Sequence, residues 1–198
     1  MRQLHRPDLH SWSCFDESRN IDFNGLLWTR PAGNVVVDPM PLGTHDQAEL
    51  GRLGGVATIV ITNSDHTRNA EHLAALFDAE VVGPAAESGS FAFTRVVGDG
   101  EAIVPGLEAL VMNGSKTPGE LALVLEGTTL ITGDLVRGQR GGELNLLPDA
   151  KLSDRDAAVA SVRRLAELPH MEAVLVGDGW PMFRDGAGGL QRLLASLG

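Results

Sequence analysis

The most informative segment of the sequence is Ile59-Val60-Ile61-Thr62-Asn63-Ser64-Asp65-His66-Thr67-Arg68-Asn69-Ala70-Glu71-His72-Leu73. Its apolar β-branched beginning is typical of a buried strand, and the apolar spacing that starts at Ala70 is typical of a helix. Small polar residues separate the two. Asp65 and His66 therefore lie where a strand gives way to a helix, and such sheet edges are where α/β proteins usually gather functional side chains.

The composition indicates a globular protein. With 198 residues and a net charge of −10, the chain can build one sizeable core, and no low-complexity linker divides it, so we expect one domain over residues 1–198. The acidic balance disfavours nucleic acid as a partner. No apolar run is long enough to span a membrane. The start of the chain lacks a signal-peptide core, and Cys14 is the only cysteine, so we expect a cytoplasmic protein.

The pattern of strands and helices predicts two strand-rich halves, each followed by helices. We expect strands at 26–29, 35–37, 57–62, 81–83, 121–125, 129–132 and 172–176, and an antiparallel meander from 91–97, 101–104 and 107–112. Helices are expected at 46–53, 67–79, 154–168 (capped by Ser153) and 187–197. Residues 1–20 and the glycine-rich stretch 137–151 are expected to be irregular. Together these elements favour two sheets packed face to face under outer helices.

Four polar loops follow predicted strands, at residues 62–69, 113–119, 133–142 and 177–184. Their cores are Thr62-Asn63-Ser64-Asp65-His66, Ser115-Lys116-Thr117-Pro118-Gly119, Thr132-Gly133-Asp134 and Gly177-Asp178-Gly179. In this order they resemble the metallo-β-lactamase superfamily, with its His-x-His-x-Asp-His, Gly-His-Thr-Pro-Gly, Thr-Gly-Asp and Gly-His-Gly motifs. Val37-Asp38-Pro39 is similar to that family's early aspartate turn. The resemblance implies an αββα four-layer sandwich, an α/β (α+β) fold with two mixed sheets flanked by helices.

The sequence departs from the family at the metal ligands. Family members hold two metal ions, typically zinc, with His and Asp side chains. Here Lys116 and Asp178 stand at usual His positions, whereas Asp134 matches the bridging aspartate. The first motif can be matched in two ways. If Asp65 and His66 are its last two residues, Ile61 and Asn63 replace the first two His. If the match starts at Thr62, the ligand positions hold Asn63, Asp65 and, at the third His, Arg68.

Three interpretations of this degenerate centre stay open. In the first, Lys116 is an internal counter-ion to Asp134 or Asp178 and supplies part of the lost metal charge. In the second, His66, Asp134 and Asp178 hold one divalent metal ion, with Asp65 as ligand or general base. In the third, His66 forms a metal-free acid/base pair with Asp65 or Asp134. Asp65 has a purely structural alternative as a helix N-cap.

The resemblance implies a hydrolase-type protein with an atypical metal centre. The catalytic candidates are Asp65, His66, Lys116 and Asp134, and the metal candidates are His66, Asp134 and Asp178. The cofactor is either one divalent metal ion (zinc, manganese or iron; carboxylates would also suit magnesium) or none. The alternative is a non-catalytic relative with a binding or structural role. We expect a small-molecule substrate and neither a nucleic-acid nor a membrane partner. Self-association into a homo-oligomer stays open. Arg137 and Arg140 could meet an anionic substrate, although solvated loop charges are the commoner interpretation.

Overall fold

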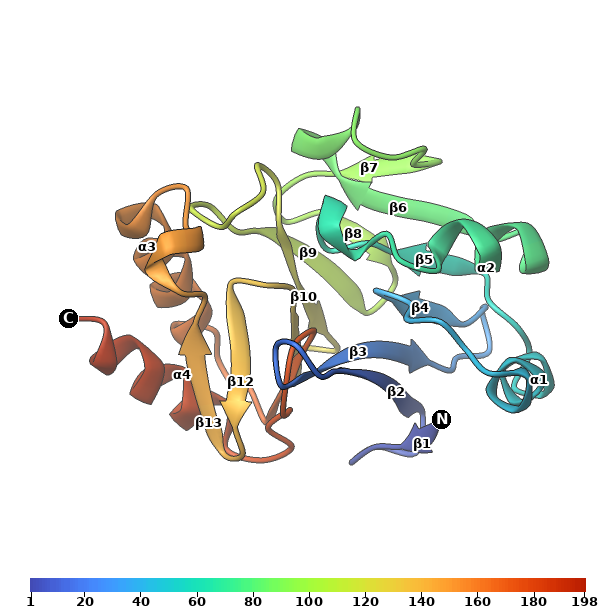
Figure 1. Cartoon of the computed structure of the whole chain (residues 1–198), viewed down its shortest axis with the longest axis horizontal. Coiled ribbons are helices and arrows are strands. Elements are labelled where there is room, and N and C mark those ends of the chain that lie inside the picture. The colour runs from blue at the N-terminus through green and yellow to red at the C-terminus, as the bar shows by residue number, and fades with distance from the viewer.

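The computed structural model describes residues 1–198, and its strands form two large mixed sheets (Figure 1). The first sheet contains seven strands in sequence order: β1 (Arg2–Gln3), β2 (Leu9–Asp16), β3 (Ile21–Trp28), β4 (Val35–Val37), β5 (Thr58–Val60), β6 (Glu80–Pro84) and β7 (Arg95–Val97). The pairs from β1 to β4 are antiparallel, and those from β4 to β7 are parallel.

The second sheet contains five strands in the order β14-β11-β10-β9-β8. They are β8 (Ala102–Val104), β9 (Leu107–Val111), β10 (Leu121–Leu125), β11 (Thr129–Thr132) and β14 (Ala173–Val176). Only β11 and β14 run parallel, because the connection between them crosses over through helix α3 (Arg155–Ala166). A separate hairpin is made of β12 (Val136–Arg140) and β13 (Glu143–Leu146).

Alternating side chains create three apolar layers. In the first sheet, Val37 and Val60 face the second sheet, whereas Val36 and Ile59 face outward. This period of two is the pattern of strands buried on both faces. Leu121, Leu123 and Leu125 of β10 complete the layer between the sheets.

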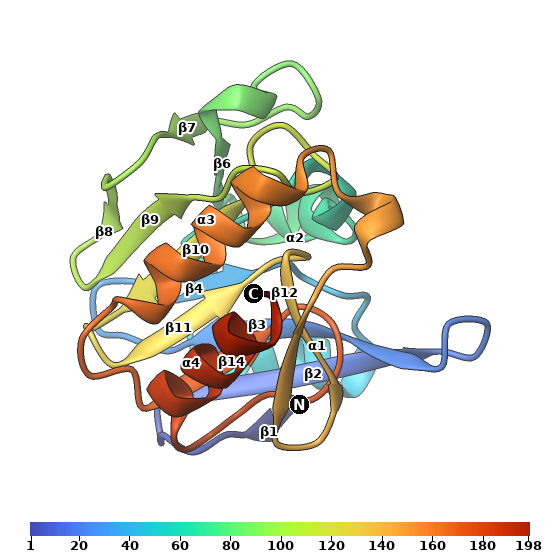
Figure 2. The same ribbon diagram turned by 90° about the vertical axis from the view of Figure 1, so that its left-hand side faces the viewer.

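Helices cover the outer face of each sheet, so the molecule has the predicted αββα order (Figures 1 and 2). Leu50 of α1 (Thr44–Arg52) and Leu73 of α2 (Ala70–Phe77) pack against the first sheet. Helices α3 (Arg155–Ala166) and α4 (Gly186–Ser196) cover the second sheet (Figure 2). Short 3-10 helices lie at Ser64–His66, Ala85–Glu87 and Asp149–Lys151. No helix combines the length and the apolar character that crossing a membrane requires.

The structure corrects four local predictions. Residues 1–20 are not irregular, since β1 and β2 pair there at the edge of the first sheet. The expected meander is split: β7 joins the first sheet, and only β8 and β9 pair with each other. The stretch 137–151 contains most of the β12–β13 hairpin. Helix α3 is capped by Asp154, whose side chain accepts a hydrogen bond from the amide of Ala157, and not by Ser153.

Candidate functional site

The four polar loops meet at one edge of the two sheets. The loop after β5 contacts the loop after β11 through Asn63, whose amide Nδ2 donates to Asp134 Oδ2 at 3.1 Å. Buried Glu87 fastens the first loop to the loop after β9: its carboxylate accepts hydrogen bonds from the amides of Ser64 at 2.6 Å and Gly119 at 3.0 Å. No pattern in the sequence indicates this role of Glu87.

Lys116 lies between two carboxylates from different sheets. Its Nζ is 2.7 Å from Asp65 Oδ2 and 2.9 Å from Asp134 Oδ2. Burial opposes the charged amine, but the charges of Asp134 and Asp65 outweigh it and raise the pKa of Lys116 above its ordinary value. Lys116 is therefore a fully charged ammonium group that joins the two loops.

His66 is buried between Asp38 and Asp134, with only 2% of its surface exposed. Its Nδ1 lies 2.8 Å from Asp38 Oδ2, and its Nε2 lies 3.3 Å from Asp134 Oδ2. Asp38 is fixed in turn by the amide and hydroxyl of Thr62, at 2.8 and 2.6 Å. Burial alone would lower the pKa of His66, but the two carboxylates raise it to about 9. His66 is thus an imidazolium at neutral pH.

The pKa values of Asp134 and Glu120 are shifted in opposite directions. Burial would raise the pKa of Asp134, but His66 and Lys116 hold it well below its usual range. Burial and the charge of Asp134 raise the pKa of Glu120 to about 7. Glu120 accepts hydrogen bonds from the Ser115 hydroxyl at 2.5 Å and the Leu135 amide at 2.7 Å. The centre therefore contains one strongly ionised carboxylate and one that titrates near neutrality.

Asp178 is held by two arginines. Arg68 Nη2 lies 3.6 Å from Asp178 Oδ1, and Arg137 contacts the other oxygen. These ion pairs are its only polar side-chain contacts, because neither carboxylate oxygen has a hydrogen bond of regular geometry. Arg137 is 7% exposed, so its interpretation as a solvated loop charge is wrong; Arg140 is exposed, as expected. The hairpin that buries Arg137 was not predicted, which is why its role was missed.

An open pocket of about 460 Å³ lies over this centre. The catalytic candidates Asp65, His66, Lys116 and Asp134 line it, together with Asp16, Arg19, Phe23, Met40 and Arg68. The guanidinium groups of Arg19 and Arg68 lie 5.6 and 5.3 Å from the centre of the Phe23 ring. All four catalytic candidates therefore reach one pocket. Asp178, the third metal candidate, is not among the residues that line it and lies beside His66 and Asp134.

The structure distinguishes the two matches of the first motif. Ile61 is fully buried in the apolar layer under α1 and α2, so its side chain cannot belong to the polar centre. Asn63 and Arg68 instead contact Asp134 and Asp178. The match that starts at Thr62 therefore fits the geometry. Asn63 also accepts the hydrogen bond of the Asp65 amide at 3.0 Å, so Asn63, not Asp65, is the local N-cap.

The comparison with known families agrees with this arrangement. The model of the family described as "Metallo-beta-lactamase superfamily" matches residues 1–197. The chain belongs to this superfamily. No curated protein matches the sequence.

Solved metallo-β-lactamases share the fold at low sequence identity. The metallo-β-lactamase DIM-1 superposes with a TM-score of 0.75 at 15% identity, covering 99% of this chain and 97% of that one. The metallo-β-lactamase from Pontibacter korlensis gives 0.73 at 16% identity, covering 96% and 93%. A metallo-β-lactamase family protein from Thermus thermophilus gives 0.71 at 21% identity, covering 96% and 79%.

The residues of this chain do not fit the superfamily's two-metal centre. On the match from Thr62, two of the ligand positions hold Arg68 and Lys116. Guanidinium and ammonium groups have no lone pair to give to a metal, and they repel a cation. Two unit charges of like sign ~4 Å apart cost about 4 kcal/mol at an effective dielectric of ~20, and a divalent ion doubles each such cost.

A single metal ion meets the same obstacle. His66, Asp134 and Asp178 offer three donor atoms that lie within 4.8 Å of one another, and three protein ligands are the number that a hydrolytic site needs. However, Lys116 already contacts Asp134, and Arg137 and Arg68 contact Asp178. The three donor atoms are enough for a metal ion. However, the positive charges of Lys116, Arg68 and Arg137 beside them would repel it.

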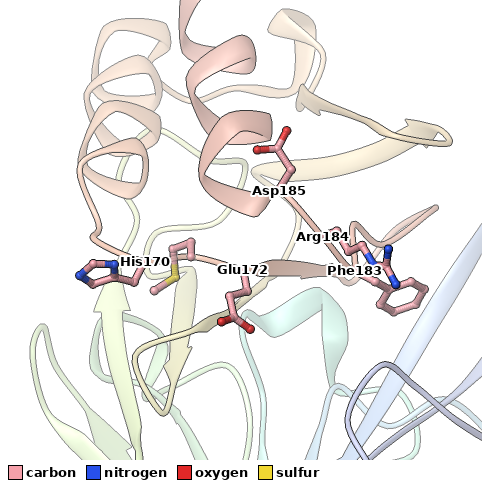
Figure 3. A pocket seen from close by; sticks show the side chains of 6 residues that line it. His170, Glu172, Phe183, Arg184 and Asp185 are labelled. Carbon is pink, nitrogen blue, oxygen red and sulfur yellow. The ribbon is translucent and has the colours of Figure 1, made fainter.

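A second hollow, of about 460 Å³, lies outside this centre (Figure 3). It is lined by His170, Met171, Glu172, Phe183, Arg184 and Asp185. Figure 3 shows His170 and Phe183 at opposite ends of it. No hydrogen bond or ion pair joins any two of these side chains, and Asp185 pairs with Arg192 instead. The hollow therefore contains no connected polar cluster.

Proposed function

We propose that this chain is a metal-independent member of the metallo-β-lactamase superfamily that binds a small molecule in the pocket over its degenerate centre. The observation that carries the proposal is the position of Lys116, 2.7 Å from Asp65 and 2.9 Å from Asp134. An ammonium group thus stands where the family's loop carries a metal-binding His. This is the non-catalytic alternative that the sequence left open.

The state of the other candidates supports a binding role. A general base needs a free lone pair or carboxylate near a proton that it can accept. Asp65 and Asp134 are both paired with Lys116, and both ring nitrogens of His66 face carboxylates. The hydroxyl of Ser115 is buried and donates to Glu120. No nucleophile in the centre has a free base beside it.

The lining of the pocket indicates the kind of ligand. Phe23 and Met40 offer an apolar surface, and Arg19, Lys116 and Asp16 surround it with charges of both signs. Ligand sites with this combination bind small molecules through an apolar body and a few polar contacts. A small polar molecule with an apolar portion therefore fits the pocket best.

Binding can be tested with a thermal-shift screen of small polar compounds on chelator-treated protein. We expect compounds that stabilise the protein and that lose this effect in Phe23→Ala. The matched control is Leu76→Ala, an exposed apolar residue that lines a different hollow. Compounds that stabilise both variants equally would place binding elsewhere. Hydrolysis of an ester, thioester, amide or phosphoester by the chelated protein, abolished in Asp134→Ala, would contradict the non-catalytic role.

A hydrolase with one metal ion is the second candidate. One observation favours it: the donor atoms of His66, Asp134 and Asp178 converge within 4.8 Å. Asp38, 2.8 Å from His66 Nδ1, would orient the ring as carboxylates do for metal-binding histidines. This candidate requires near-stoichiometric zinc, manganese or iron in the purified protein and activity that a chelator removes.

A further inference from the structure

The carboxylates of the centre need positive charge from some source. Asp134 and Asp178 are each 1% exposed and lie side by side with His66. Lys116 contacts both Asp65 and Asp134 and so connects Asp65 to this group. A buried carboxylate without a cation is strongly destabilising, whether the cation is a metal ion or a side chain. Asp134 and Asp178 therefore each need a cation beside them, whereas Asp65 is exposed to solvent.

Lys116 supplies the positive charge beside Asp65 and Asp134. Its Nζ is 2.7 Å from Asp65 and 2.9 Å from Asp134. Lys116 and Asp134 follow strands of the second sheet, whereas Asp65 follows β5 of the first. This one ammonium group therefore neutralises charge and also links the two sheets at their common edge.

Arg68, in the loop before α2, and Arg137, in the separate β12–β13 hairpin, supply the positive charge beside Asp178. Arg68 precedes α2 on the first sheet's side and contacts one oxygen, and Arg137 belongs to β12 and contacts the other. Arg137 also lies 3.5 Å from Asp134 Oδ1. Asp178 is thus clamped between two guanidinium groups, one from each half of the chain.

The backbone of Arg68 shows that its position is enforced. Its φ is +34°, in a region that is unfavourable for a residue with a Cβ. The guanidinium is held by the carbonyls of Asn24 and Asp38, by Asp178 and by the face of Phe23. Contacts from several elements thus keep Arg68 in a strained conformation that points it into the centre.

We infer that Lys116, Arg68 and Arg137 take the place of metal ions as partners of these carboxylates and hold the two sheets closed at the pocket. These three cations balance Asp65, Asp134 and Asp178. The sequence pointed to Lys116 alone, and the two arginines are assigned by the geometry. The inference rests on the metal-independent function proposed above and adds the residues that make it stable.

Metal rescue tests the replacement. Lys116→Met and Arg137→Met each remove a cation that contacts a buried carboxylate, so we expect each to melt roughly 5–10 °C below the parent protein. Added Mn²⁺ or Zn²⁺ should restore part of this loss in the variants and leave the parent unchanged. The matched controls are Lys151→Met and Arg140→Met, which remove exposed charges of the same kind. They should melt like the parent.

A charge-neutral double variant keeps the test decisive if Lys116→Met fails to fold. Lys116→Met combined with Asp134→Asn removes both partners of the pair, so its loss should be smaller than the sum of the two single losses. Additive losses, or a Lys116→Met protein that melts like the parent, would overturn the inference. So would a parent protein whose melting temperature falls on chelation. Turnover by the chelated parent would contradict the binding function alone and leave the replacement intact.

Discussion

The side chain of His66 joins the two sheets by lying between Asp38, which follows β4 of the first, and Asp134, which follows β11 of the second. Its ring nitrogens are 2.8 Å and 3.3 Å from the two carboxylates. This arrangement is a buried, paired imidazolium, and it makes the stability of the protein depend on pH.

We predict that His66 contributes stability below neutral pH and loses it in alkali. Its pKa is raised from 6.5 to about 9 in the folded state, so its contribution is fully present below pH 6.5 and disappears as the pH rises through 9. The size is on the order of 3 kcal/mol. Urea denaturation of the parent and of His66→Gln across this range measures it. The difference between them should shrink as the pH rises; a constant difference would refute the assignment.

Glu120 should add a second, more acidic transition. Its pKa is raised from 4.5 to about 7, because burial and Asp134 disfavour the carboxylate. Its contribution is therefore complete below pH 4.5 and is lost as the pH rises through 7. Glu120→Gln removes the charge, keeps an oxygen that can accept from the Leu135 amide, and places an NH2 group that can donate to the Ser115 oxygen. We expect this variant to gain stability relative to the parent as the pH rises from about 5 to about 8, which denaturation at both pH values will show.

Glu87 should be essential to the shape of the pocket. Its carboxylate accepts from the amides of Ser64 and Gly119, one from each of two loops. Glu87→Ala leaves both donors without this partner and should cost about 2–5 kcal/mol, since charge-assisted bonds contribute roughly 1.5–3 kcal/mol each. Glu87→Gln should cost less. Equal, small losses for the two variants would show that water replaces the carboxylate.

Gly114 should be intolerant of any side chain. It has a φ of +82°, and a Cβ there would lie 2.2 Å from the carbonyl oxygen of Asp154 at the start of α3. Gly127 also has a positive φ, of +69°, but a Cβ there meets open space. Gly127→Ala should therefore cost about 1 kcal/mol and Gly114→Ala clearly more. Comparing the melting temperatures of the two variants tests this. Gly127→Ala adds only backbone strain, whereas Gly114→Ala adds the same strain and a clash with the backbone of Asp154.

The fold could be predicted from the sequence because its signals are local and agree with one another. The runs Val35-Val36-Val37 and Leu121–Leu125 are apolar throughout, and such runs indicate strands buried on both faces. The ordered loops around Asp65, Lys116, Asp134 and Asp178 then pointed to the superfamily. The β12–β13 hairpin was not predicted because glycines and charged residues interrupt the alternation of apolar and polar residues that indicates a strand.

The partners within the centre could not be read from the sequence in the same way. A carboxylate or guanidinium has the same local pattern whether it is solvated or buried, so nothing near Arg137 or Glu87 revealed a partner tens of residues away. Arg68 is an instructive intermediate case. The motif placed it at a ligand position, but only the geometry shows that it contacts Asp178.

The measurement that tests this account most directly is the metal content of the parent protein, purified without chelators and without added metal. Elemental analysis after gel filtration should find zinc, manganese and iron far below one ion per chain, because Lys116, Arg68 and Arg137 already balance the carboxylates. Near-stoichiometric content of any of these metals, removed by a chelator and lost in Asp134→Asn, would contradict it.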